Sequence, residues 1–170
     1  RITFIRHETN AGLFPTLNEL ASVATAPRLR FWAQDDVMLP HCLAAEHAFL
    51  RQHPNVVMTY CEYERIDENG QTVRPIPFDD TPALLESWHA AQIAFYWGSI
   101  AGNISTAAVS RQVFERVGGF GRFRVAGDFD LWVRIAEHGV TGFVREPLVQ
   151  VRDHSRQFSQ TFPQFLRFIL

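Results

Sequence analysis

The feature that most limits the fold of this chain is an alternation of short apolar runs with amphipathic segments. Strand patterns are predicted at residues 2–5, 29–33 and 56–63, and helix patterns at 15–24 and 40–53 lie between them. Because parallel strands need crossover connections, the order strand–helix–strand–helix–strand favours right-handed βαβ units. The sequence therefore predicts an α/β fold with a mostly parallel sheet flanked by helices.

The second half of the chain is predicted to continue with helices and shorter strands. Further helices are expected at 81–96, 110–118, 128–138 and from 161 onward, and strands at 143–144 and 148–151 on either side of Pro147. A turn is expected at 67–70. One face of helix 40–53 should carry Leu43, His47 and Leu50, and helix 128–138 should bury Leu131, Trp132 and Ile135. There is no repeat and no low-complexity linker, so 1–170 is predicted to be one domain.

Composition and missing motifs exclude several classes of function. The formal net charge of −2 gives no basic stripe for nucleic acid. No apolar run approaches the roughly 20 residues that cross a bilayer. The two cysteines form no C-x-x-C pair, which fits a reducing compartment, and the histidines lack zinc-ligand spacing. P-loop, G-x-S-x-G and G-x-G-x-x-G motifs are absent.

Gln34-Asp35-Asp36 follows a predicted buried strand. In open α/β sheets ligands bind beyond the carboxyl ends of strands. Two adjacent carboxylates repel each other unless a cation lies between them, and Mg²⁺ or Mn²⁺ prefers such oxygen ligands. The alternative is a solvated turn that caps the next helix, and for an isolated Asp-Asp pair this alternative is the commoner one.

Asp128-Phe129-Asp130 begins a predicted helix. An acidic residue in a first helical turn is ordinarily a cap or a complement to the helix dipole. A carboxylate beside a cleft can instead act as a general base. Residues two apart on a helix point in different directions, so only one of the two could serve one cleft.

Arg152-Asp153-His154 follows the last predicted strand, with Gln157-Phe-Ser159 close behind. A lone histidine is more often a hydrogen-bonded structural residue than a ligand.

The order and spacing of these segments resemble family 2 of the GT-A glycosyltransferases. Phe31-Trp-Ala-Gln-Asp-Asp-Val-Met-Leu-Pro40, preceded by Asn10-Ala-Gly12, looks like the family's metal-binding strand end. Val117-Gly-Gly-Phe120 and Gly127-Asp-Phe-Asp-Leu-Trp-Val-Arg134 are similar to its "GGF … ED-x-D-L-W-x-R" segment, and Arg152-Asp-His154 resembles its closing "R-x-H … S" element. The segment from Phe49 to Gly70 also fits, so the resemblance covers most of the chain.

The resemblance implies a GT-A fold and inverting transfer of a sugar from a nucleoside diphosphate sugar to a carbohydrate or lipid-linked acceptor. It implies that Asp36 and Asp35 hold Mg²⁺ or Mn²⁺, that Asp128 is the catalytic base, and that His154 makes a late metal or diphosphate contact. By position, further substrate contacts are expected from Asn10, Gly12, Gln34, Gly102, Asn103 and Arg152. Trp97 is either a platform for a sugar ring or ordinary core packing. The implied location is the cytoplasm or the inner face of the membrane.

The sequence departs from the family in three places. Gly127 replaces the usual acidic residue before the base, and Ala33 replaces a common carboxylate. The nucleotide-binding strands that open the family's fold have no counterpart before Arg1, so the chain is expected to be part of a longer enzyme. The alternative is a non-catalytic carbohydrate- or nucleotide-binding module derived from such an enzyme.

Overall fold

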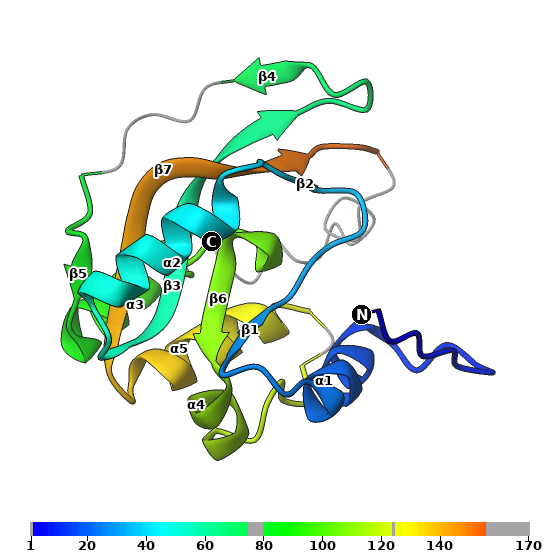
Figure 1. The fold of residues 1–170 in the computed structure, drawn as a ribbon, viewed down its shortest axis with the longest axis horizontal. Coiled ribbons are helices and arrows are strands. Elements are labelled where there is room, and N and C mark those ends of the chain that lie inside the picture. The colour runs from blue at the N-terminus through cyan, green and yellow to red at the C-terminus, as the bar shows by residue number, and fades with distance from the viewer. Residues whose placement is uncertain (1, 75–79, 124, 156–170) are drawn as a thin grey trace.

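The computed structural model describes residues 2–74, 80–123 and 125–155, which form one sheet with helices on both faces (Figure 1). The strands are β1 Arg28–Arg30, β2 Val37–Met38, β3 Val56–Ile66, β4 Thr72–Arg74, β5 Leu84–Leu85, β6 Ala107–Ser110 and β7 Val140–Arg152. The helices are α1 Leu13–Val23, α2 Cys42–Gln52, α3 Ser87–Trp97, α4 Arg111–Arg116 and α5 Gly127–Ala136, with a 3-10 turn η1 at Ile104–Thr106.

The sheet is mixed, so the prediction of a mostly parallel sheet is wrong. The strand order is β1-β6-β3-β7-β2, with β4 added to β3 and β5 added to β7. Among the described strands only β3 and β7 pair in parallel. Strands β2, β4 and β5 join the sheet antiparallel, and so does β6, a short run of small residues that the sequence pattern did not reveal. It lies between β1 and β3 and runs antiparallel to both.

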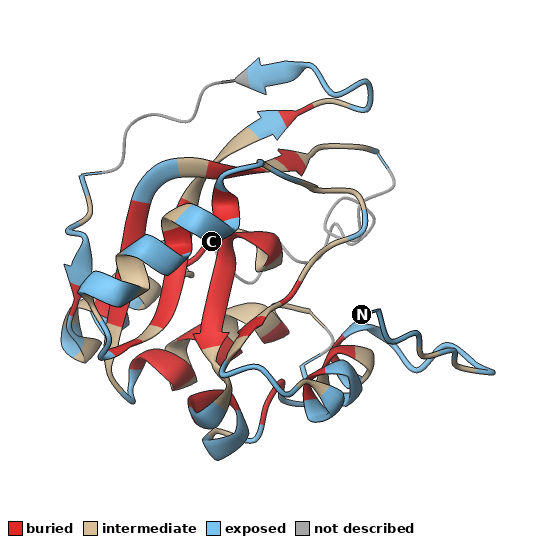
Figure 2. Ribbon diagram, in the orientation of Figure 1, coloured by how far each residue is buried: buried red, intermediate tan, exposed pale blue. Residues whose placement is uncertain are grey.

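The helices cover the two faces unequally. Helix α2 packs on one face, where Cys42 meets Cys61 and Leu148. Helices α1, α3, α4 and α5 contribute to the larger cluster on the other face, which includes Met58 and Tyr60 of β3. Alternate residues of β3 thus enter different clusters, as expected for a strand buried on both faces. Figure 2 shows the buried residues concentrated in β6, β3 and β7.

Several predicted elements differ from the structure. Residues 2–5 form no strand, and Ile2 and Phe4 are 95% and 84% exposed. The helix expected from residue 81 begins only at Ser87, because Leu84–Leu85 pairs with β7. The two strands expected around Pro147 are one strand, β7. A register shift opposite Pro147, at Glu62 of β3, accommodates a residue that cannot donate to the ladder.

Helix α2 turns a different face inward from the one predicted. Leu43 is 59% exposed, whereas Cys42 and Glu46 are buried. The Glu46 carboxylate accepts hydrogen bonds from Arg30 at 2.9 Å and from Thr59 at 2.5 Å. A buried charge is tolerated when it is paired and hydrogen-bonded in this way, and these partners come from distant strands.

Helices α1, α4 and α5 confirm the predictions for their regions. Leu131, Trp132 and Ile135 of α5 are fully buried. Ser110 caps α4 by accepting a hydrogen bond from the Val113 backbone N–H at 3.4 Å. No helix of the described residues is long and apolar enough to span a membrane. The helix predicted from residue 161 and the segment 157–159 lie outside the described residues.

Candidate active site

Asp35 and His154 meet where the β1–β2 loop crosses the carboxyl end of β7. Asp35 Oδ2 and His154 Nε2 are 2.8 Å apart, although the two residues are far apart in the sequence. Their side chains are 32% and 25% exposed, so the pair is partly shielded but open to solvent. Strands β3 and β7 both end here, which is the edge where ligands bind in open α/β sheets.

Asp36 points inward and holds the loop in place. Its Oδ2 accepts a hydrogen bond from Ser105 Oγ at 2.6 Å, and its Oδ1 accepts one from the Arg152 backbone N–H at 3.1 Å. Ser105 Oγ in turn accepts a hydrogen bond from the Ala33 backbone N–H at 3.0 Å. Burial raises the pKa of Asp36, and the hydrogen bonds from Ser105 Oγ and the Arg152 N–H partly offset that rise. Asp36 therefore connects the loop to both η1 and β7.

Arg152 fastens the same loop to the β3–β4 turn. Its Nε donates to the Asp35 carbonyl at 3.0 Å, and its Nη1 donates to the carbonyls of Asp67 and Glu68 at 2.8 and 3.2 Å. The turn itself is closed by the Asp67 side chain, which accepts hydrogen bonds from the backbone N–H groups of Asn69 and Gln71. The predicted contact residue Arg152 thus has a structural task at this edge.

Asn103 and Gly102 border the same junction. The Asn103 side chain caps η1 by accepting a hydrogen bond from the Ser105 backbone N–H at 2.7 Å. A Cβ added to Gly102 would lie 3.3 Å from the Tyr63 ring, so a larger residue would push on β3. Sequence reasoning missed Ser105, since a serine two residues beyond an asparagine carries no signal of its contact with Asp36.

A carboxylate oxygen of Asp35 and an imidazole nitrogen of His154 are groups that can bind a divalent cation, and here they contact each other directly. Two ligands at neighbouring corners of an octahedron with bonds of about 2.1 Å lie about 3.0 Å apart, close to the observed 2.8 Å. Mg²⁺ sites commonly use one or two protein ligands and take the rest from water and phosphate. Among the described residues, no three His, Cys, Asp or Glu side chains converge on one point. Asp35 and His154 could thus supply two ligands to such a cation, and the Asp36 carboxylate is already engaged by Ser105 and the Arg152 N–H.

Asp128 lies in the first turn of α5. Burial raises its pKa, and the backbone N–H groups of Asp128 and Phe129 offset part of that effect. Ala126, directly before the helix, has a left-handed backbone with φ of 56°, a strained conformation for a residue with a side chain. Strain of this kind next to a partly buried carboxylate is common at functional sites.

Asp130, two residues after Asp128, forms an ion pair with Arg134 on the same helix. Its Oδ2 accepts two hydrogen bonds from Arg134, from Nε at 3.0 Å and from Nη2 at 2.7 Å. Arg134 also donates to the carbonyls of Val117 and Gly119, at 2.8 and 2.9 Å. Asp130 thus belongs to a clasp between α5 and the end of α4. No ion pair of the described residues involves Asp128, so the two carboxylates have separate environments.

The remaining predicted contact residues do not join the Asp35 cluster. Asn10 accepts a hydrogen bond from the Gly12 N–H at 2.9 Å, next to the start of α1. Gln34 is exposed on its loop, and Trp97 is 82% exposed at the end of α3. Within the described chain no hydrogen bond or ion pair joins Asp128 to Asp36, so their shared cleft stays a prediction.

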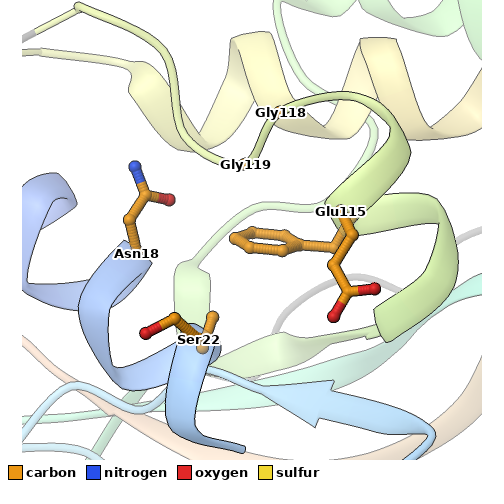
Figure 3. Close-up of a pocket in the computed structure, with 7 residues that line it drawn as sticks. Asn18, Ser22, Glu115, Gly118 and Gly119 are labelled. Carbon is orange, nitrogen blue, oxygen red and sulfur yellow. The ribbon is translucent and has the colours of Figure 1, made fainter.

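A surface hollow of about 300 Å³ lies between α1 and the end of α4 (Figure 3). Its lining residues are Asn18, Ala21, Ser22, Phe114, Glu115, Gly118 and Gly119. None of the predicted site residues lines it, and it is mainly apolar. It lies at the junction of the two helices.

The comparisons with known proteins point to one class, the glycosyltransferases, although no family model matches the chain. A relative from Bacillus subtilis (strain 168), "Putative glycosyltransferase EpsE", is 28% identical over 162 residues, which are 94% of this chain and 55% of that protein. The predicted resemblance to glycosyltransferases is thereby confirmed.

Solved structures of TarS from S. aureus share the fold. The complex with UDP-GlcNAc gives a TM-score of 0.68 at 15% identity, over 89% of this chain and 42% of that one. The complex with UDP gives 0.67 at 16% identity, over 88% and 43%. The chain therefore spans about half the length of the relatives it matches.

Proposed function

We propose that this chain is the metal-binding and acceptor-side portion of an inverting glycosyltransferase that uses a nucleoside diphosphate sugar. The observation that carries the proposal is the 2.8 Å approach of Asp35 and His154 at the carboxyl ends of β3 and β7. The supporting comparison is the shared fold with TarS, whose crystal structures contain UDP-GlcNAc and UDP. The acceptor is proposed to be a carbohydrate or a lipid-linked sugar.

Asp35 and His154 are the proposed ligands of a divalent cation, Mg²⁺ or Mn²⁺. When bound, such a cation would neutralise negative charge on the leaving nucleoside diphosphate. Asp36 is assigned the supporting task of fixing the loop that presents Asp35, because both of its oxygens already accept hydrogen bonds. Mutual repulsion between neighbouring carboxylates also falls when Asp36 is held by donors.

Asp128 is the proposed general base. It accepts the proton of the acceptor hydroxyl while the hydroxyl oxygen forms a bond to the anomeric carbon of the sugar. The bond from that carbon to the diphosphate breaks on the opposite face, and the nucleoside diphosphate leaves with the electron pair, which inverts the configuration. A pKa raised by burial makes a carboxylate a stronger base, closer to the pH at which the reaction runs.

The exposed end of α3 is the proposed platform for the acceptor. Trp97, Phe95 and Tyr96 are 82%, 83% and 74% exposed, so core packing does not explain Trp97. Clusters of exposed aromatic rings on soluble domains commonly mark binding sites. Only four residues separate Trp97 from Gly102, which adjoins the Asp35 region through η1.

The proposal is tested by calorimetric titration of UDP into the full-length protein with and without Mn²⁺. Asp35→Ala and His154→Ala should each weaken Mn²⁺-dependent binding by about 10-fold or more, as loss of a metal contact does. Asp153→Ala is the matched control, since this neighbouring carboxylate pairs with Arg65 instead. Equal Mn²⁺-dependent affinity in all three variants and the parent protein would rule out the metal assignment.

Turnover separates the enzyme from the non-catalytic module. The enzyme should release UDP from a UDP-sugar in the presence of acceptor, and the rate should depend on Mn²⁺ or Mg²⁺. Metal-dependent binding of UDP without any transfer to the acceptors tested would favour the binding module.

A further inference from the structure

The aromatic ring of Phe14 presses against the backbone that begins α5. Phe14 lies in α1 and is only 6% exposed. A Cβ added to Gly127 would lie 2.6, 2.8 and 2.9 Å from three carbons of that ring, closer than real Cβ contacts occur. The residue directly before Asp128 is therefore in steric contact with a helix more than a hundred positions earlier in the sequence.

Backbone conformation does not explain why a glycine stands at position 127. The glycines with positive φ are Gly12, Gly70, Gly98, Gly118 and Gly119, and Gly127 is not among them. Gly127 is instead the first residue of the α5 helix, where any L-residue fits the backbone. The requirement for glycine at this position is thus a requirement for space, and Phe14 takes that space.

Phe14 itself is held firmly. Its ring stacks on Phe120 with centroids 5.0 Å apart, and Phe120 packs edge-on against Phe31 at 4.9 Å. The Phe120 backbone is clamped by Asn18 of α1, which accepts a hydrogen bond from its N–H at 2.9 Å and donates one to its carbonyl at 3.0 Å. Because interiors are close-packed, a side chain at 127 could not be absorbed by moving the ring alone.

We infer that Phe14 is a positioning residue: it seats Gly127 and so sets the place and direction of the Asp128 carboxylate. This inference rests on the proposed role of Asp128 as the base. It also accounts for the absence of a second carboxylate before Asp128, because a glutamate at 127 and a phenylalanine at 14 cannot occupy the same space. A misplacement of about 1 Å in a reacting group can lower a rate by about 100-fold.

The test is a double-mutant cycle in the full-length protein. Gly127→Ala should lower kcat by about 10-fold or more while the KM for the donor stays within about 2-fold, since the donor side is untouched. Phe14→Ala alone should also lower kcat, and the double variant should lose less than the two single losses combined, because removal of the ring opens room for the new methyl group. Wild-type kcat in Gly127→Ala, or a double variant whose loss equals the two single losses combined, would overturn the inference.

Two controls separate positioning from loss of stability. Gly142→Ala introduces an equally close clash, with Phe49 on the α2 face of the sheet, and should lower the melting temperature without changing kcat per folded molecule. If Gly142→Ala lowers kcat as much as Gly127→Ala does, the effect is general destabilisation and the inference fails.

If Gly127→Ala does not fold, Phe14→Leu is compared with Leu17→Ala in the same α1 cluster. Only Phe14→Leu should then lower kcat, and equal kcat in the two would overturn the inference.

Asp128→Asn separates this inference from the proposed function. Full turnover in Asp128→Asn would remove the base assignment itself. An inactive Asp128→Asn beside a fully active Gly127→Ala would leave the base in place and overturn only the role of Phe14.

Discussion

The Asp35 edge and the Asp128 region are built by different forces. At the Asp35 edge, loops are joined by hydrogen bonds through Ser105, Arg152 and Asp36, and the side chains remain partly exposed. Around Asp128, helices α1, α4 and α5 meet through a cluster of phenylalanines and close glycine contacts. The polar network depends on satisfying each donor and acceptor, whereas the rings depend on close packing with their neighbours.

This difference predicts where substitutions should act. Changes at the Asp35 edge should alter ligand affinity, and should lower stability where a hydrogen bond between the loops is lost. Changes around Asp128 should alter either the chemical step or the packing of three helices.

Asp128→Asn should lower kcat by about 100-fold or more. Asparagine keeps the size and capping ability of aspartate but cannot take up the acceptor's proton. The affinity for UDP should stay unchanged, because the donor is expected at the other region. Steady-state transfer and calorimetry on the same preparation measure both quantities, and a variant with near-normal kcat would refute the base assignment.

Asp36→Ala should weaken Mn²⁺-dependent UDP binding and also lower the free energy of unfolding by about 1–3 kcal/mol, while the fold is retained. The second effect arises because Ser105 and the Arg152 N–H lose their acceptor in a partly buried place. Urea denaturation measures it. If stability falls and binding does not, Asp36 serves the fold alone.

Stability against pH gives a third test, through the raised pKa of Asp128. A carboxyl group whose pKa is higher in the folded than in the unfolded state favours folding when protonated and opposes it when ionised. Relative to wild type, Asp128→Asn should therefore be more stable at pH 7. This advantage should shrink as the pH falls through the raised pKa and vanish below the ordinary value of 3.8. Melting temperatures between pH 3 and pH 7 would show it, and an advantage that grows toward acid would contradict the assigned direction.

The smallest effect is expected for Asp130→Asn. The Asp130–Arg134 pair is partly exposed, so its loss should cost about 0.3–1 kcal/mol. Turnover should stay close to wild type, since Asp130 has no proposed chemical role. A loss of turnover as large as that of Asp128→Asn would reverse the assignment of the two carboxylates.

The sequence predicted the parts of the fold whose signals are local. Helix α5 has an acidic first turn, an apolar face and a glycine after its end, and β3 is a long apolar run. Strand β6 was missed because Ala107–Ser110 has no strand pattern by itself and is defined by its neighbours β1 and β3. The inward face of α2 was predicted wrongly because burial of the Glu46 carboxylate depends on hydrogen bonds from Arg30 and Thr59. Both donors lie on strands distant in the sequence.

The candidate site shows the same limit. The motif around Asp35 and the histidine at 154 could be singled out from sequence, and the structure brings both to one point. The sequence could not show which of Asp35 and Asp36 faces the solvent and which holds the loop in place. That difference depends on the hydrogen bonds from Ser105 and the Arg152 N–H to Asp36. The steric link between Phe14 and Gly127 was equally invisible, because the two positions share no pattern.

Phe31 has a consequence for the thermodynamics of ligand binding. Its ring packs against Phe114 and Phe120, and Phe31 is the first residue of the β1–β2 loop that carries Asp35. With Ser105 and Arg152 fixing its other end, this loop has little conformational freedom left to lose. A ligand that binds to it should therefore encounter only a small entropic penalty from the protein, and binding should approach that of a rigid receptor.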